Sequence, residues 1–217
     1  MNPFIENATR TVVYYHADCS DGLAAAWAIR TLLGVAPEYV PLKHGTPAPT
    51  NIADKFVIYV DIVPTSVVLL QVISGARGVL VLDHHKTTRA TLETFEGPNY
   101  WYIHDEPRSG PQLAWARAHP GAAVPEFLLY VAARDLWAWE SVPNAREICD
   151  AMHLQGFGTS FEVLDECFAK GGQVNTLENL AVGQTVALLK QQSMTKHQKE
   201  ARLGRFAYVV DGVIRTA

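Results

Sequence analysis

The chain has 217 residues, of which 48% are hydrophobic and 18% are charged, and its formal net charge is −4. This length and apolar content suit one large α/β domain, or one domain with an appendage. The negative balance excludes a general attraction to nucleic acid, so a nucleic-acid substrate would need a local basic patch or metal ions.

Localisation is indicated by the cysteines and by two absences in the sequence. The cysteines Cys19, Cys149 and Cys167 have no paired spacing, which favours reduced thiols in a cytoplasm over disulfides. The N-terminus lacks the pattern of a signal peptide. No apolar run approaches the roughly 20 residues that span a bilayer. We therefore expect a cytoplasmic protein that has no membrane partner.

The first half of the chain alternates between β-branched runs and helical segments. We expect strands at 11–15, 39–42, 56–60, 79–82 and 100–103, and helices at 23–33, 65–73 and near 88–95. This alternation predicts an α/β fold with a doubly wound, mostly parallel sheet and flanking helices.

After Pro111 the pattern becomes helical. Helices are expected at 112–118, 126–137, 145–152, 161–169 and 177 to about 203, with one late strand at 205–214. We expect residues 1–176 to form the main domain, with a helical C-terminal part. Residues 177–217 would form a linker-like or dimerisation extension.

Acids and histidines follow three of the predicted strands. In open α/β sheets ligands bind outside the carboxyl ends of the strands, so these side chains should converge in one crevice. Asp135 interrupts a helical run and could close the site from the side. The three strand-end groups are His16, Asp18 and Asp21; Asp61; and Asp83, His84 and His85.

Single members of this set also have ordinary structural explanations. Asp21 and Asp61 could cap helices, Asp135 could pair with Arg134, and His16 alone could be a structural histidine. The adjacent pair His84 and His85 is harder to explain by packing, because a buried acid beside two imidazoles calls for a cation. The remaining histidines do not belong to such a group of acids and histidines and are interpreted as surface or structural: His44, His104, His119, His153 and His197.

The set is too large for one structural zinc ion. Carboxylates mixed with imidazoles suit Mn²⁺, Mg²⁺ or Fe²⁺ better than a soft metal. The abundance of ligands predicts two ions about 3.5–4 Å apart, bridged by a carboxylate and a water. Such a pair suits the hydrolysis of phosphate esters or anhydrides.

Four motifs resemble those of the DHH phosphoesterase superfamily, and they occur in its order. They are HADCSDG at 16–22, VDIVP at 60–64, LDHHKT at 82–87 and RDLW at 134–137. The segment SGPQLAW at 109–115 resembles the element that follows the DHH triplet in many members. The resemblance covers roughly residues 11–140, and makes residues 1–176 a DHH phosphoesterase domain.

The resemblance implies a phosphohydrolase with two Mn²⁺ ions, with Mg²⁺ or Co²⁺ as alternatives. His16 and Asp18 would hold the first ion, Asp21, His84 and Asp135 the second, and Asp61 would bridge both. His85 would act on the scissile phosphate, and the catalytic set would be His85, Asp61 and His84. Asp83 would orient a ligand histidine.

The sequence departs from the family pattern in two places. Asp18 and Asp21 are separated by two residues rather than one, which leaves Cys19 as an alternative to Asp18. We favour Asp18, because hard ions prefer oxygen. The family's C-terminal substrate-binding domain has no counterpart, since Gly171 and Gly172 form only an isolated pair. We expect either a minimal or truncated member, or a member that holds its substrate in some other way.

We therefore predict hydrolysis of phosphodiesters or phosphomonoesters in small nucleotides, short oligonucleotides or nucleic-acid ends. The basic residues nearest the motifs are Arg108, Lys86 and Arg134, which are candidates for phosphate contacts. The alternatives are a nucleotide-binding protein without turnover and an enzyme similar to family II pyrophosphatases. A homodimer formed through the extension is a further expectation.

Overall fold

The computed structural model describes residues 7–202, 207–210 and 213–216. Five parallel strands form one sheet, in the order β2-β1-β3-β4-β5. The strands are β1 (Thr11–His16), β2 (Glu38–Leu42), β3 (Phe56–Val60), β4 (Gly78–Asp83) and β5 (Tyr100–His104). The predicted α/β class and parallel sheet are confirmed.

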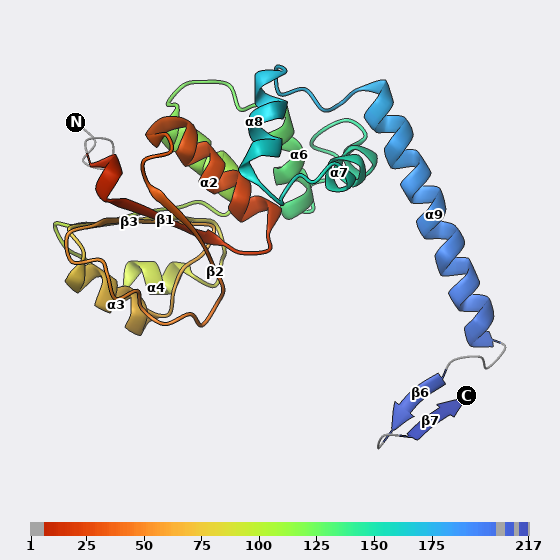
Figure 1. Cartoon of the computed structure of the whole chain (residues 1–217), viewed down its shortest axis with the longest axis horizontal. Helices are drawn as coiled ribbons and strands as arrows, with labels where there is room; N and C mark the ends of the chain where they lie inside the picture. The colour runs from red at the N-terminus through yellow and green to blue at the C-terminus, as the bar shows by residue number, and fades with distance from the viewer. Residues whose placement is uncertain (1–6, 203–206, 211–212, 217) are drawn as a thin grey trace.

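Helices cover both faces of this sheet. Alternate strand residues point to opposite faces, so each strand contributes apolar side chains to two cores. Val13 and Ile58 belong to one core, which packs under α2 (Ser20–Leu33) and α5 (Gly110–Ala118). Val12 and Val57 belong to the other, under α3 (Ser66–Gly75) and α4 (Arg89–Glu93). Figure 1 shows α2 on one side of the sheet and α3 and α4 on the other. The sheet is doubly wound.

The order of the strands reverses between β1 and β3. β1 pairs with β2 on one side and with β3 on the other. Loops that leave two such strands depart toward opposite faces, which leaves a crevice at their carboxyl ends. His16 and Asp61 lie at this position, at the end of β1 and directly after β3.

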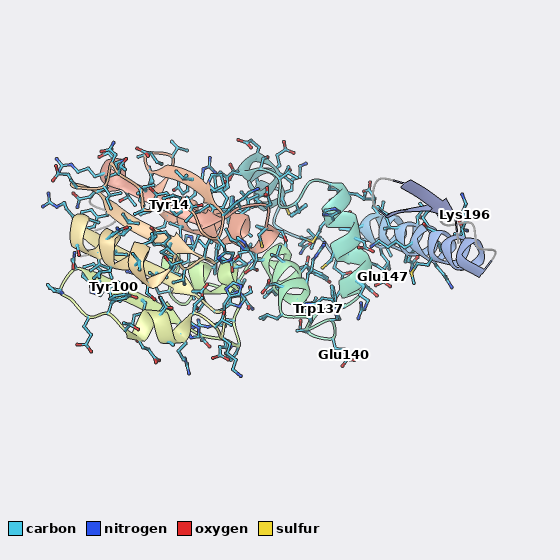
Figure 2. All side chains as sticks on the ribbon, turned by 90° about the horizontal axis from the view of Figure 1, so that it is seen from below. Tyr14, Tyr100, Trp137, Glu140, Glu147 and Lys196 are labelled. Carbon is cyan, nitrogen blue, oxygen red and sulfur yellow. The ribbon has the colours of Figure 1, made fainter. Side chains whose placement is uncertain are left out.

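The second half of the chain adds helices beside the sheet. α6, α7 and α9 follow one another away from the sheet (Figures 1 and 2). α9 packs so closely against α7 that a Cβ atom added to Gly183 would clash with the Glu147 carbonyl oxygen. The separate C-terminal unit stays a prediction. The helices are α6 (Glu126–Asp135), α7 (Ala145–Leu154), α8 (Phe161–Ala169) and α9 (Leu177–Arg202), and the chain opens with the 3-10 turn η1 (Ala8–Arg10).

Two predicted boundaries matter for function, and one predicted element is wrong. α2 begins at Ser20 rather than at residue 23, so Asp21 lies in its first turn. α6 ends at Asp135, two residues before the predicted end.

The single late strand at 205–214 is replaced by two antiparallel strands, β6 (Ala207–Val210) and β7 (Val213–Thr216). The sequence between them is Asp-Gly, a dipeptide typical of hairpin turns. Residues 205, 206, 211 and 212 lie outside the described residues.

In the part of the chain that the structure describes, no helix combines the length and the hydropathy needed to cross a bilayer.

Candidate metal centre

Ligand-type side chains gather at the carboxyl edge of the sheet and form three overlapping groups. The groups are His16, Cys19 and Asp61; Asp61, His84 and His85; and Asp21, His84 and Asp135. Within each group the ligand atoms lie within 4.8 Å of one another. Asp61 belongs to the first two groups and His84 to the last two. The structure thus brings together five of the six residues predicted as metal ligands.

His84 lies at the centre of the acids. Its side chain is buried, and its Nε2 atom is 3.1 Å from Asp61 Oδ1, 3.5 Å from Asp135 Oδ2 and 3.6 Å from Asp21 Oδ2. One imidazole nitrogen cannot satisfy three carboxylates, because it carries at most one proton. The arrangement therefore has an excess of acceptors that suits a cation.

Asp21 provides the most direct test of whether a metal ion fits. Its Oδ2 atom accepts a hydrogen bond of 2.8 Å from the Gly110 backbone N–H, whereas its buried Oδ1 atom has no hydrogen-bond partner among the described residues. Burial raises the pKa of Asp21 well above its usual value, and the nearby carboxylates of Asp61 and Asp135 add to the rise. A buried carboxylate oxygen without a partner is costly. A divalent cation would supply that partner, so the residues fit a metal site.

Asp61 reaches into the site through an unusual backbone conformation. Its φ angle is +58°, which is rare for residues other than glycine, and its backbone N–H donates to the Leu82 carbonyl at 2.9 Å. Burial alone would raise the pKa of Asp61, but the imidazoles of His16, 3.7 Å away, and of His84, 3.1 Å away, outweigh it, so the pKa is lowered. Asp61 is thus held as a carboxylate between two imidazoles, the position expected of a bridging ligand.

Asp83 orients the second histidine of the triplet. Asp83 is fully buried; its Oδ1 atom lies 2.9 Å from His85 Nδ1, and its Oδ2 atom accepts from the His85 backbone N–H at 3.0 Å and from the Thr88 hydroxyl. The hydrogen bond with Asp83, opposed by burial, raises the pKa of His85 to about 9. Asp83 was expected to orient a ligand histidine; the histidine that it holds is His85, whose side chain is 40% exposed.

The structure does not bring Asp18 into any of the three ligand groups. Asp18 has a φ angle of +56°, and its carboxylate is 79% exposed and pairs with Lys43 at 2.9 Å. The backbone turn directs the next residue inward instead, so that Cys19 Sγ lies 3.8 Å from Asp61 Oδ2. Burial raises the pKa of the Cys19 thiol to about 11, so the thiol keeps its proton at neutral pH. A metal ion would have to displace this proton to bind Cys19.

Substitutions at Cys19 and Asp18 should therefore affect metal binding differently. We expect Cys19→Ala to weaken Mn²⁺ binding by about tenfold or more, since a ligand of the first group is lost. Asp18→Asn should leave Mn²⁺ affinity within roughly twofold, because it removes only an exposed ion pair. Calorimetric titration of both variants with Mn²⁺ measures this. A larger loss in Asp18→Asn than in Cys19→Ala would restore the original prediction.

The three basic residues proposed for phosphate contacts are separated in space. Arg134 precedes Asp135 and lines the cleft beside the ligand groups. Arg108 is paired with Asp105 at 2.6 Å, and Lys86 is exposed outside the cleft lining. Of the three predicted contacts, the structure places only Arg134 in the cleft.

Several residues that shape the site were missed by sequence reasoning. Gly110 begins α5 directly beneath the acids: a Cβ atom there would lie 2.7 Å from Asp21 Oδ2 and 3.0 Å from Asp61 Cβ. The Gln112 side chain accepts a hydrogen bond of 3.1 Å from the Ser109 backbone N–H, as in one half of a capping box, and the Ser-x-x-Gln pattern could have marked this helix start. The ring of His44, interpreted as surface or structural, lies 5.0 Å from that of His16.

Comparison with known proteins adds one relative. The chain is 32% identical over 161 residues to an uncharacterized protein of Acanthamoeba polyphaga mimivirus. The matched region is 67% of this chain and 38% of the viral protein, so the chain spans well under half of that relative's length. No family model and no solved structure matches the chain.

Proposed function

We propose that this protein is a phosphohydrolase of the DHH phosphoesterase type that uses two divalent cations to cleave phosphate esters of nucleotides or nucleic-acid ends. The observation that carries the proposal is the sharing of Asp61 and His84 among the three ligand groups. Shared ligands of this kind hold two ions close together. Mn²⁺ is our first choice of metal, with Co²⁺ and Mg²⁺ as alternatives, and Cys19 would favour the softer ions.

The residues divide into holding and positioning roles. His16, Cys19 and Asp61 would hold one ion, and Asp21, His84 and Asp135 the other, with Asp61 between them. When bound, such ions supply an acidified water and neutralise charge on a phosphoryl group. His85 keeps Nδ1 on Asp83, which leaves Nε2 as the ring nitrogen that can donate a proton to a phosphoryl or leaving-group oxygen. Gly110 N–H holds Asp21 in place.

A substrate panel tests the proposed function. Metal-stripped protein is assayed with Mn²⁺, Mg²⁺ or Co²⁺ against bis(p-nitrophenyl) phosphate, short oligonucleotides, cyclic dinucleotides, 3′-phosphoadenosine 5′-phosphate and pyrophosphate. We expect cleavage of at least one phosphate ester only when metal is present. Cleavage of pyrophosphate alone would favour the pyrophosphatase alternative. Tight nucleotide binding without any product would favour a binding protein.

Metal binding should also be visible as stability. A ligand at 100 times its dissociation constant stabilises the folded state by about 2.7 kcal/mol. For a chain of this size, Mn²⁺ should then raise the melting temperature by roughly 5–10 °C over protein kept in EDTA. Thermal unfolding monitored by circular dichroism measures this shift. An unchanged melting temperature at millimolar Mn²⁺ would contradict the proposed centre.

The three cysteines are free in the structure. We propose that the protein works in a reducing compartment such as the cytoplasm, where Cys19 would remain available as a thiol.

A further inference from the structure

A cleft of about 950 Å³ opens beside the candidate metal centre. One end is formed by Cys19, Asp21 and Asp135, and its walls come from the end of α6, from α7 and from α9. Figure 2 labels Trp137, which follows α6, and Glu147 on α7, and both line this cleft. Its volume is at the upper end of the roughly 300–1,000 Å³ range of small-molecule sites.

Trp137 is the most unusual residue in the cleft lining. It lies two residues beyond Asp135, its φ angle is +55°, and it is 76% exposed. A bulky residue in this conformation is strained, and such strain is concentrated at functional sites. An indole that is both strained and exposed beside a metal centre presents a flat surface for a planar ligand.

The neighbouring residues extend this flat surface and add positive charge. The ring of Trp139 meets that of Trp137 edge-to-face at 5.9 Å, and the Arg146 guanidinium lies 4.5 Å from the Trp139 ring centroid. Arg134 and Arg146 are both exposed in the cleft, whereas Lys190 is paired with Asp150 at 2.7 Å. Guanidinium groups beside aromatic faces suit a ligand that joins an aromatic base to a phosphate.

The charges of the cleft link this ligand to the metal. Five acidic and three basic side chains line the cleft, so without metal the lining carries more acidic than basic groups. Two divalent cations at the acidic end would more than reverse that balance. Binding of a phosphate-bearing ligand should therefore depend on metal.

We propose that this cleft binds a nucleobase joined to a phosphate, with the base stacked on Trp137 and phosphate oxygens contacting Arg134 and Arg146. This inference rests on the proposed function, since it places the reacting phosphate toward Asp21 and Asp135. The ligand is either a mononucleotide or the end of a single strand. The volume of the cleft favours the strand end, because it leaves room for more than one nucleotide.

Fluorescence anisotropy with the Mn²⁺-loaded 217-residue chain tests the inference. The labelled probe is a trinucleotide with phosphorothioate linkages, which resist hydrolysis. Its competitors are AMP and an abasic trinucleotide backbone. We expect Trp137→Ala to weaken binding of the trinucleotide by about tenfold or more, and Trp137→Phe to keep most of the affinity. The abasic competitor should bind about tenfold more weakly than the trinucleotide in the wild-type protein.

Trp101→Ala is the matched control, because Trp101 is an exposed indole on β5 (42%) that does not line the cleft. It should bind the trinucleotide as the wild-type protein does. Competition by AMP equal to that by an unlabelled trinucleotide would identify the mononucleotide as the ligand. It would still support the proposal that the cleft binds a nucleobase joined to a phosphate.

The inference is overturned if the wild-type protein does not bind the trinucleotide, or if Trp137→Ala binds within twofold of it. Equal competition by the abasic backbone would also overturn it. These failures are separate from failure of the proposed function, which is scored by metal-dependent cleavage of bis(p-nitrophenyl) phosphate.

Discussion

Replacing Asp61 with asparagine is expected to reduce metal-dependent phosphodiester cleavage by about 10³-fold, since loss of a bridging carboxylate removes several kcal/mol of transition-state stabilisation. Asparagine is the appropriate replacement because it tolerates the positive φ angle of this position, whereas alanine would add strain. Its carbonyl oxygen can still accept a hydrogen bond from His84. Steady-state rates with Mn²⁺ and bis(p-nitrophenyl) phosphate measure the effect.

Asp54→Asn provides the matched control for Asp61→Asn. Asp54 is an exposed acid that precedes β3, at the opposite end of this strand from Asp61, and it does not line the cleft. The same chemical change should therefore leave the cleavage rate within roughly twofold. If Asp61→Asn kept more than a tenth of the wild-type rate, Asp61 could not be a bridging ligand.

His84→Ala should remove activity to a similar extent and should also destabilise the metal-free protein. It deletes the only imidazole in the described structure that lies among Asp21, Asp61 and Asp135, so the buried Asp61 Oδ1 atom loses its 3.1 Å hydrogen bond. Losing such a partner costs about 1–3 kcal/mol of unfolding free energy. Urea unfolding in EDTA measures the stability, and the cleavage assay measures the activity.

His153→Ala is the control for this substitution, because His153 is an exposed histidine on α7. Its stability should stay within about 0.5 kcal/mol of the wild-type value. Wild-type cleavage rates in His84→Ala would show that His84 is not a ligand and would remove the basis for a shared two-ion centre.

Much of the fold could be predicted because each strand is a short apolar run with a clear end. Val79 to Leu82 lead directly into the DHH triplet, and the buried strand β4 covers this run. The start of α2 could not be predicted as well, because Ser20 and Asp21 have low helix propensity and read as a loop. The late hairpin was missed because its two short strands form one continuous apolar pattern, interrupted only by Asp-Gly.

The site was predictable where its position depends on the strand ends alone. His16, Asp61 and His84 converge because parallel strands share one carboxyl edge. Whether Asp18 or Cys19 faces the site depends instead on one backbone turn, in which Asp18 has a positive φ angle. No residue pattern predicts a positive φ angle at an aspartate. Gly110 could not be found either, because its role depends on how closely α5 approaches Asp21.

The cleft could not be predicted from the motifs, for a different reason. It is built from α6, α7 and α9, whose packing is set by long-range contacts such as the close approach of Gly183 to Glu147. Trp137 belongs to a recognised motif, but only the three-dimensional structure shows it to be exposed and strained beside Asp135.

Asp135 is the one candidate ligand in the described structure that comes from the helical half of the chain; the others come from the strand ends and the first turn of α2. An ion held by Asp135 and His84 would fasten the end of α6 to the sheet. Metal release and loosening of α6 would then be thermodynamically coupled, and each would favour the other. Amide hydrogen exchange in α6 would then report metal occupancy, and a partner that binds the helical half could distinguish the metal-loaded protein from the metal-free one.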